Sequence, residues 1–232
     1  MANANNCALE VLARCPANAE EFQERGILLR LSDLRLAPPV PRPGKIICLG
    51  RNYRAHAAEA AMDLPKVPEL FSKYANTLIG HREAIRLPPS SKSVDYEAEL
   101  AVVIGRGGRH IHEADAMSHV AGYTIFNDVS ARDYQFATSQ WLAGKTFDTF
   151  GPMGPWLTTR GDIPDPHSLG IKLEISGEVL QDGTTADLLF SIPYTIAFIS
   201  DILTLEPRGR HFDGDSRRRG LCQKAAAFPS RR

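Results

Sequence analysis

The chain has few cysteines and no long apolar run. Its 232 residues include four scattered cysteines with no Cys-x-x-Cys pair: Cys7, Cys15, Cys48 and Cys222. This spacing argues against a zinc site or a disulfide framework and favours a reducing compartment, with the cytoplasm as the default. No apolar stretch approaches the ~20 residues of a membrane span, and the first residues lack the basic and apolar regions of a secretory signal. We therefore expect a cytoplasmic protein without a membrane partner.

The formal charge of zero hides an asymmetry between the two parts of the chain. Residues 208–232 hold eight of the 27 Lys and Arg residues but only two acids, whereas the first 207 residues have a net charge of −6. A basic tail on an acidic body is typical of a nucleic-acid arm. That interpretation predicts steeply salt-dependent binding that disappears when residues 208–232 are deleted.

The expected secondary structure combines several short strands with helices. Strands are expected at 45–50, 95–105 and 123–126, with a hairpin of 171–175 and 178–181 around Ser-Gly. Helices are expected at 7–25, 51–60, 114–120, 129–141 and from 192 onward, where Ser191 is a candidate N-cap. Loops are expected at 38–44, 67–90, 144–148 and 151–155. This pattern indicates a mostly-β or α+β fold.

Three carboxylates form the first candidate site. Glu97 and Glu99 lie two residues apart in the expected strand 95–105, so their side chains share one face. Asp128 follows the expected strand 123–126. A lone Glu-x-Glu is usually a solvated strand face, but three carboxylates with water make a suitable octahedral site for Mg²⁺.

His56 and Glu59 form a second candidate pair. If residues 51–60 are helical, the two side chains lie on one face and can hydrogen-bond. A carboxylate beside a histidine fixes the tautomer and raises the basicity, which suits a general base. Taken alone, the pair is more often a surface contact worth a few tenths of a kcal/mol.

A third group of candidate residues follows Asp128 along the chain. Lys145 follows Gly144 in an expected loop, where an ammonium group can bind a carboxylate or oxyanion. Arg132 and Gln135 follow Asp128 by four and seven residues, so all three share a face if this segment is helical. A solvated lysine is the ordinary alternative for Lys145.

Five motifs occur in an order that closely resembles the fumarylacetoacetate hydrolase family. They are Gly-Arg-Asn-Tyr at 50–53 with His56 and Glu59, Asp-Tyr-Glu-Ala-Glu-Leu at 95–100, Asn-Asp-Val-Ser-Ala-Arg-Asp at 127–133 with Gln135, Gly-Lys-Thr-Phe-Asp at 144–148, and Phe-Ser-Ile-Pro at 190–193. The resemblance covers about residues 38–207.

This resemblance implies an α+β fold, a mixed β-sandwich roll, and usually a homodimer. It implies Mg²⁺ or Mn²⁺ on the residues that match Glu97, Glu99 and Asp128. It also implies a His56–Glu59 dyad that activates water, and three side chains around the substrate: Arg132, Gln135 and Lys145.

The resemblance implies a metal-dependent hydrolase or lyase that cleaves a C–C bond in short 2-oxo or 2,4-dioxo acids. Acylpyruvate hydrolysis and oxaloacetate decarboxylation are the reactions expected first. One alternative is an isomerase or hydratase of 2-oxo acids in aromatic catabolism. Another is an inactive, dimerising pseudoenzyme, because the end of the chain departs from the family pattern.

The departure begins after Pro207, where the family continues with a Thr-Gly-Thr-Pro loop and two strands. Codons permitted for residues 211–216 encode Ile-Ser-Thr-Gly-Thr-Pro when they are shifted by one base. We therefore predict a frameshift and three segments: an N-terminal extension at 1–37, an incomplete catalytic domain at 38–207, and an aberrant basic tail at 208–232. The fold is then truncated at its C-terminal strands, and a nucleic-acid partner becomes improbable.

Overall fold

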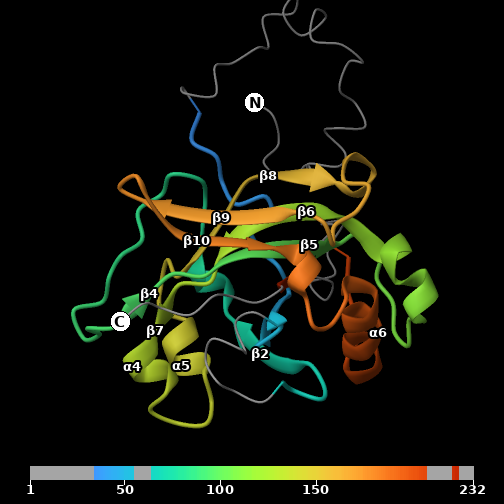
Figure 1. Ribbon diagram of the computed structural model, residues 1–232, viewed down its shortest axis with the longest axis horizontal. Coiled ribbons are helices and arrows are strands. Elements are labelled where there is room, and N and C mark those ends of the chain that lie inside the picture. The colour runs from blue at the N-terminus through green and yellow to red at the C-terminus, as the bar shows by residue number, and fades with distance from the viewer. Residues whose placement is uncertain (1–33, 55–63, 208–220, 225–232) are drawn as a thin grey trace, which may run out of the picture.

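A seven-stranded mixed sheet forms the centre of the computed structural model, which describes residues 34–54, 64–207 and 221–224 (Figure 1). The strand order is β2-β1-β11-β5-β6-β8-β3. The strands are β1 (Lys45–Gly50), β2 (Glu69–Lys73), β3 (Leu78–Ile79), β5 (Ala98–Ile104), β6 (Val120–Asn127), β8 (Gly151–Thr159) and β11 (Leu221–Lys224). The β1–β11 and β3–β8 pairs are parallel and the others are antiparallel, so the expected mixed sheet is present.

Two smaller sheets accompany the central one. β4 (Val94–Asp95) pairs with β7 (Ser130–Ala131), and β9 (Gly170–Ile175) pairs with β10 (Glu178–Thr184). The β9–β10 hairpin lies over β5 and β6 in Figure 1. The Gln181 amide accepts a hydrogen bond from the Ala98 main-chain nitrogen at 2.9 Å and donates one to the Ala98 carbonyl at 2.7 Å, which attaches β10 to β5.

Strand β5 separates two hydrophobic clusters. Ala98, Leu100 and Val102 belong to the larger cluster, whereas Ala101 and Val103 belong to a second one. This alternation follows the two-residue period of a strand and confirms the faces expected from the sequence. All seven residues of β5 are buried because both faces of the sheet are covered here.

Helix α6 (Ile192–Ile202) begins as the sequence predicts. The Ser191 hydroxyl accepts a hydrogen bond from the Tyr194 main-chain nitrogen at 3.2 Å and caps the helix. The buried face contains Ile192, Ile196 and Ile199, which recur at helical spacing. The expected β9–β10 hairpin is confirmed too, and its turn, Ser176-Gly177, has positive φ angles of 52° and 84°.

The remaining helices within the described residues are short. They are η2 (Ala75–Thr77), η3 (Glu113–His119), η4 (Arg160–Asp162), η5 (Thr185–Asp187), α4 (Arg132–Gln135) and α5 (Leu142–Lys145). Figure 1 shows α4 and α5 beside β4 and β7, at the opposite end of the molecule from α6. In the part of the chain that the structure describes, no helix is long and apolar enough to span a bilayer.

Three stretches differ from the expected secondary structure. The stretch 67–90 contains β2 and β3, and the expected loop 151–155 is the start of β8. The expected helix 129–141 is reduced to α4, preceded by the two-residue strand β7. The prolines and glycines of these stretches favour loops locally. The pairing of β2 with β1, and of β8 with β3 and β6, overrides these local preferences.

The C-terminal tail contributes to the sheet, contrary to expectation. Its β11 strand pairs in parallel with β1 (Lys45 opposite Leu221) and antiparallel with β5 (Val103 opposite Cys222). The sequence analysis expected a fold truncated at its C-terminal strands, whereas the structure places these four residues in the central sheet. The expected helix 7–25 and residues 208–220 and 225–232 lie outside the described residues, and the frameshift remains a prediction.

Candidate metal centre

Three buried carboxylates converge at one end of β5 and β6. Glu97 directly precedes β5, Glu99 lies within it, and Asp128 directly follows β6. Each offers one oxygen, and these oxygens lie within 4.8 Å of one another. The β5–β6 ladder places them, because Ala98 lies opposite Asn127 and the Asp128 main-chain nitrogen donates to the Glu97 carbonyl at 2.8 Å.

The donor set of this cluster fits a hard divalent cation. Glu97, Glu99 and Asp128 are 5%, 1% and 0% exposed, so water screens their mutual repulsion poorly. Carboxylate oxygens are the ligands that Mg²⁺ and Mn²⁺ prefer, whereas zinc is more often bound by Cys and His. The convergence expected from the sequence is present, and metal binding itself remains a proposal.

Lys145 lies directly against two of these carboxylates. Its Nζ is 2.7 Å from Glu97 Oε2 and 3.1 Å from Asp128 Oδ2. Burial lowers the pKa of this ammonium, but the negative charges of Asp128 and Glu97 outweigh burial and hold the pKa above its usual range. Lys145 ends helix α5 rather than lying in a loop, and it is a buried cation rather than a solvated one.

Lys73, on β2, is a second buried lysine that the sequence analysis did not assign to the site. Its Nζ donates to Asp128 Oδ1 at 2.6 Å and to the Val129 carbonyl at 2.9 Å. Glu69, Phe71 and Lys73 are spaced two residues apart along β2, so their side chains share one face of the strand. The Phe71 ring centroid on this face lies 5.0 Å from the Nζ of Lys145. This two-residue spacing could have indicated that Lys73 faces the site, but it lay in the stretch 67–90, which the sequence analysis interpreted as loop.

Arg132 completes the positive side of the cluster. Its Nη1 lies 2.6 Å from Glu97 Oε1 and 2.7 Å from Gln135 Oε1, and its Nη2 lies 2.7 Å from Asp95 Oδ2. Burial lowers the pKa of this guanidinium, but Glu97 and Asp95 outweigh burial and raise it. The structure thus places Arg132, paired with Gln135, beside Glu97 and Asp95, and their expected role around the substrate stays a prediction.

The cluster is nearly balanced in charge. Within the described residues it contains four carboxylates and three cations, which leave a formal charge of −1: Asp95, Glu97, Glu99 and Asp128, with Lys73, Lys145 and Arg132. A divalent cation would change this to +1. The bound centre would then attract an anionic substrate.

His56 and Glu59 lie outside the described residues, so their predicted roles are not tested. The chain leading to them is well fixed. Asn52 Oδ1 accepts from the Phe190 main-chain nitrogen at 2.7 Å, and Asn52 Nδ2 donates to the Phe190 carbonyl at 3.2 Å. Tyr53 is 1% exposed, and burial, followed by the charge of Glu99, raises the pKa of its phenol.

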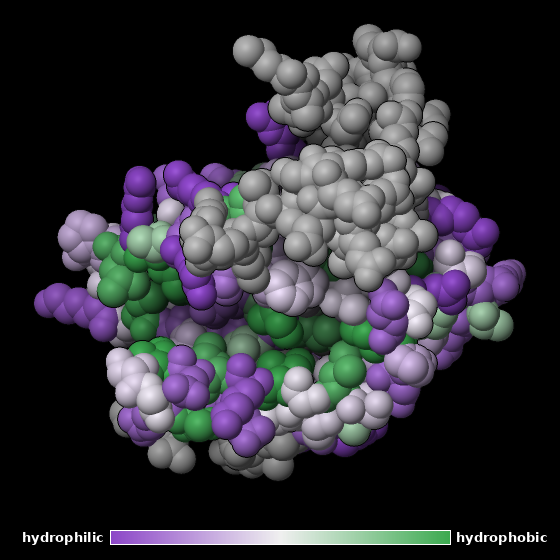
Figure 2. Space-filling view, turned by 90° about the horizontal axis from the view of Figure 1, so that it is seen from above, coloured by the Kyte–Doolittle hydropathy of each residue, from purple (hydrophilic) through white to green (hydrophobic). Residues whose placement is uncertain are grey.

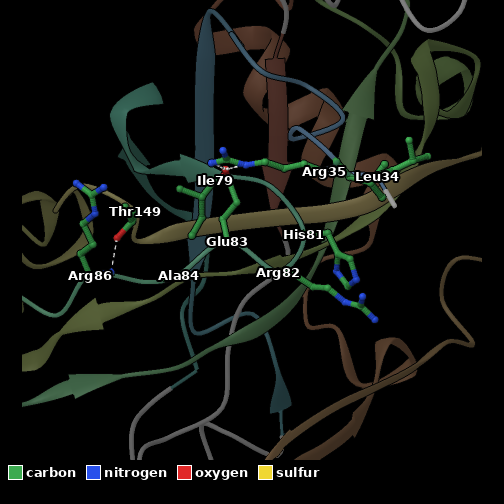
Figure 3. A pocket seen from close by; sticks show the side chains of 10 residues that line it. Leu34, Arg35, Ile79, His81, Arg82, Glu83, Ala84, Arg86 and Thr149 are labelled. Carbon is green, nitrogen blue, oxygen red and sulfur yellow. Dashed lines mark hydrogen bonds and ion pairs between the residues drawn. The ribbon is translucent and has the colours of Figure 1, made fainter. Parts of the chain in front are cut away.

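A cavity of about 450 Å³ lies elsewhere on the molecule (Figure 3). Its lining includes Arg35, Glu83 and Thr149 but none of the clustered carboxylates. In Figure 3, Arg35 points toward Glu83, with which it forms an ion pair, and the Thr149 hydroxyl accepts a hydrogen bond from the Arg86 main-chain nitrogen. We place the candidate site at the carboxylate cluster because its polar groups are buried and converge.

The fold and the cluster together define a mixed-sheet α+β protein with a candidate site for a divalent cation. The family described as fumarylacetoacetate (FAA) hydrolase C-terminal matches residues 45–208. This chain belongs to the fumarylacetoacetate hydrolase family. The resemblance noted in the sequence is thereby confirmed.

Named relatives and solved structures agree with this assignment. The chain is 44% identical over 203 residues to the mitochondrial oxaloacetate tautomerase FAHD2A of Homo sapiens, covering 87% of this chain and 65% of that protein. It therefore spans about two thirds of that relative. The crystal structure of 5-carboxymethyl-2-hydroxymuconate delta-isomerase from Mycobacterium smegmatis matches with a TM-score of 0.71 and 37% identity, covering 84% of this chain and 72% of that one.

A further solved structure supports the same fold. Fumarylacetoacetate hydrolase from Exiguobacterium antarcticum matches with a TM-score of 0.71 and 30% identity, covering 88% of this chain and 70% of that one. The α+β fold of this family is thus established for the chain. These comparisons do not show the truncation that the sequence analysis expected.

Proposed function

We propose that this protein is a divalent-metal-dependent tautomerase or isomerase of small 2-oxo acids, with oxaloacetate as the first substrate to test. The carrying observation is the buried cluster of Glu97, Glu99 and Asp128 beside Lys145. The choice of reaction is supported by relatives named oxaloacetate tautomerase and by a structural neighbour named as an isomerase. These names favour the isomerase alternative over C–C bond cleavage, which was the main expectation from the sequence.

Keto–enol tautomerisation of oxaloacetate moves one proton between C3 and the oxygen on C2. No C–C bond breaks and no water is consumed. Bound Mg²⁺ or Mn²⁺ would supply a Lewis acid for the developing negative charge on that oxygen. Glu97, Glu99 and Asp128 would hold the cation. Lys145 and Arg132, both in contact with Glu97, would attract the substrate carboxylates.

The base that removes the C3 proton is proposed to be His56, oriented by Glu59. Support comes from the fixed position of Tyr53, because the chain leaves this buried residue near Glu99. A base three residues further along would start close to the bound substrate. Gln135, held by Arg132, is proposed to orient the substrate through its amide.

The deciding experiment follows two products of oxaloacetate in parallel. The enol is monitored by its ultraviolet absorbance and released pyruvate by a coupled assay, with and without Mg²⁺. We expect metal-dependent equilibration of keto and enol forms without pyruvate. Release of pyruvate, or cleavage of an acylpyruvate, would instead support the hydrolase or lyase reading. No turnover of any tested 2-oxo acid would support the inactive pseudoenzyme.

A homodimer and the cellular compartment also remain proposals. Large apolar side chains are exposed on the central sheet, including Ile125 on β6 at 46% and Trp156 on β8 at 57%. Figure 2 shows hydrophobic residues grouped across the middle of one face, with hydrophilic residues beside and below them. Such surfaces favour association with a second copy. The relative's name places that protein in mitochondria, whereas the cysteine pattern gave the cytoplasm as the default.

A further inference from the structure

We propose that Lys73 sets the charge of the metal centre, so that its ammonium weakens the binding of the divalent cation and keeps the bound cation electrophilic. This makes Lys73 a positioning and charge-setting residue that acts through Asp128. The inference rests on the metal site of the proposed function. It does not depend on which 2-oxo acid is the substrate.

The contacts of Lys73 fix its charge close to one candidate ligand. Its Nζ lies 2.6 Å from Asp128 Oδ1, and both side chains are fully buried at 0% exposure. A second hydrogen bond, 2.9 Å to the Val129 carbonyl, holds the ammonium against the main chain. Because no water screens this pair, its charge acts strongly on any ion at the same carboxylate.

The two buried lysines have different geometry. Lys145 bridges two carboxylates, Glu97 and Asp128, and also lies against the Phe71 ring. Lys73 contacts Asp128 through the other carboxylate oxygen, Oδ1, and the main chain beyond it. Lys145 therefore shares its charge between two carboxylates, whereas Lys73 acts on the cluster through Asp128 alone.

Charge explains why such a residue matters for chemistry. Three carboxylate ligands carry more negative charge than a divalent cation can balance, so they bind it tightly but reduce its power as a Lewis acid. An ammonium that donates to Asp128 withdraws electron density from this ligand and repels an entering cation. Removing that ammonium should tighten metal binding and slow the reaction.

A purely structural role predicts a different pattern. If Lys73 only held Asp128 in place, its loss would disorder a ligand and weaken metal binding. The direction of the change in metal affinity therefore separates the two roles. This measurement is made on protein stripped of metal and needs no turnover.

The test compares Lys73→Gln with Lys73→Met. Gln is neutral but keeps an N–H donor for Asp128, whereas Met removes both the charge and the donor. Titration of metal-free protein with Mn²⁺, followed by the electron paramagnetic resonance of the free ion, should show binding at least about tenfold tighter for Lys73→Gln. The kcat for oxaloacetate tautomerisation should fall by about tenfold with KM little changed.

Lys172→Gln is the matched control, because Lys172 is exposed on β9 and undergoes the same chemical change. Its Mn²⁺ affinity and kcat should equal those of the unmodified protein. Thermal melting establishes that each variant is folded. If the Lys73→Met variant does not fold, the result for Lys73→Gln alone is used to judge the inference. Unchanged or weaker Mn²⁺ binding by folded Lys73→Gln overturns the inference.

The two proposals fail in distinguishable ways. Tighter Mn²⁺ binding by Lys73→Gln, in a protein that tautomerises none of the 2-oxo acids, supports the role of Lys73 and refutes the proposed reaction. If the unmodified protein shows metal-dependent tautomerisation but Lys73→Gln binds Mn²⁺ with unchanged affinity, the proposed reaction is supported and the role of Lys73 is refuted.

Discussion

The ion pairs of the candidate metal centre and the ion pair beside the surface cavity use similar groups in opposite environments. Lys73 and Asp128 are both 0% exposed, whereas Arg35 and Glu83 are 85% and 24% exposed. Water can replace a lost partner at the surface but not in the buried cluster. A buried ion pair also contributes little net stability, because desolvation offsets the attraction. The buried charges are thus explained better by binding than by stability.

The largest effect is expected from removing the carboxylate that the two lysines share. Asp128→Ala leaves the ammonium groups of Lys73 and Lys145 buried without this partner. We expect a loss of about 3–5 kcal/mol in the free energy of unfolding, measured by urea denaturation. Asp128→Asn, which keeps an acceptor, should lose less. An Asp128→Ala protein as stable as the unmodified one would show that the cluster is hydrated and that the contrast with the surface is false.

The next effect concerns binding rather than stability. Glu99→Gln keeps the shape of the side chain but removes one candidate ligand charge. Mn²⁺ binding should weaken by about 100-fold or more, and metal-dependent turnover should be lost with it. Glu113→Gln, at an exposed position of η3, is the matched control and should bind as before. If Glu99→Gln binds Mn²⁺ as tightly as the unmodified protein does, Glu99 is not a ligand of the cation.

A buried polar contact without charge sharpens the comparison. Gln181→Ala removes the amide that bonds both main-chain groups of Ala98. Two buried polar groups then lose a partner, which should cost about 1–3 kcal/mol in urea denaturation. Gln140→Ala, at an exposed position, should cost far less. Equal losses in the two variants would show that burial does not govern these contacts.

The smallest effect is expected at the surface pair. Arg35→Ala should leave the melting temperature unchanged within error, because water screens an exposed charge. The hydrogen bond from the Gly80 main-chain nitrogen is the largest cause of the lowered pKa of Glu83, and Arg35 contributes less. This pKa should therefore stay below its usual range in the variant when followed by NMR titration. A return to the ordinary value would assign the shift to Arg35.

The sign of this pH effect follows from the direction of the shift. A lowered carboxyl pKa adds stability above the pKa of the unfolded chain. That contribution is lost as the pH falls through the pKa of the folded state. In the Arg35→Ala variant, the free energy of unfolding should therefore still fall at acid pH as Glu83 is protonated, nearly as much as in the unmodified protein.

The sequence predicted the parts of the site that depend on short-range patterns. Glu97 and Glu99 share a face because of the strand period alone, and the family order added Asp128. Lys73 was missed because it meets Asp128 across 55 residues of chain. Such pairing depends on how β2 docks, which local composition does not encode. For the same reason β11 was not expected, since its pairing with β1 and β5 is wholly long-range.

Strand β2 makes the site sensitive to errors of alignment. It stands at the end of the order of strands described for the sheet, and its ladder with β1 sets Lys73 opposite Ile46. A slip of one residue would exchange its two faces, so that Leu70 and Ser72 would point toward the carboxylates. Deletion of one residue within β2 ahead of Lys73 should therefore abolish function even when the protein still folds.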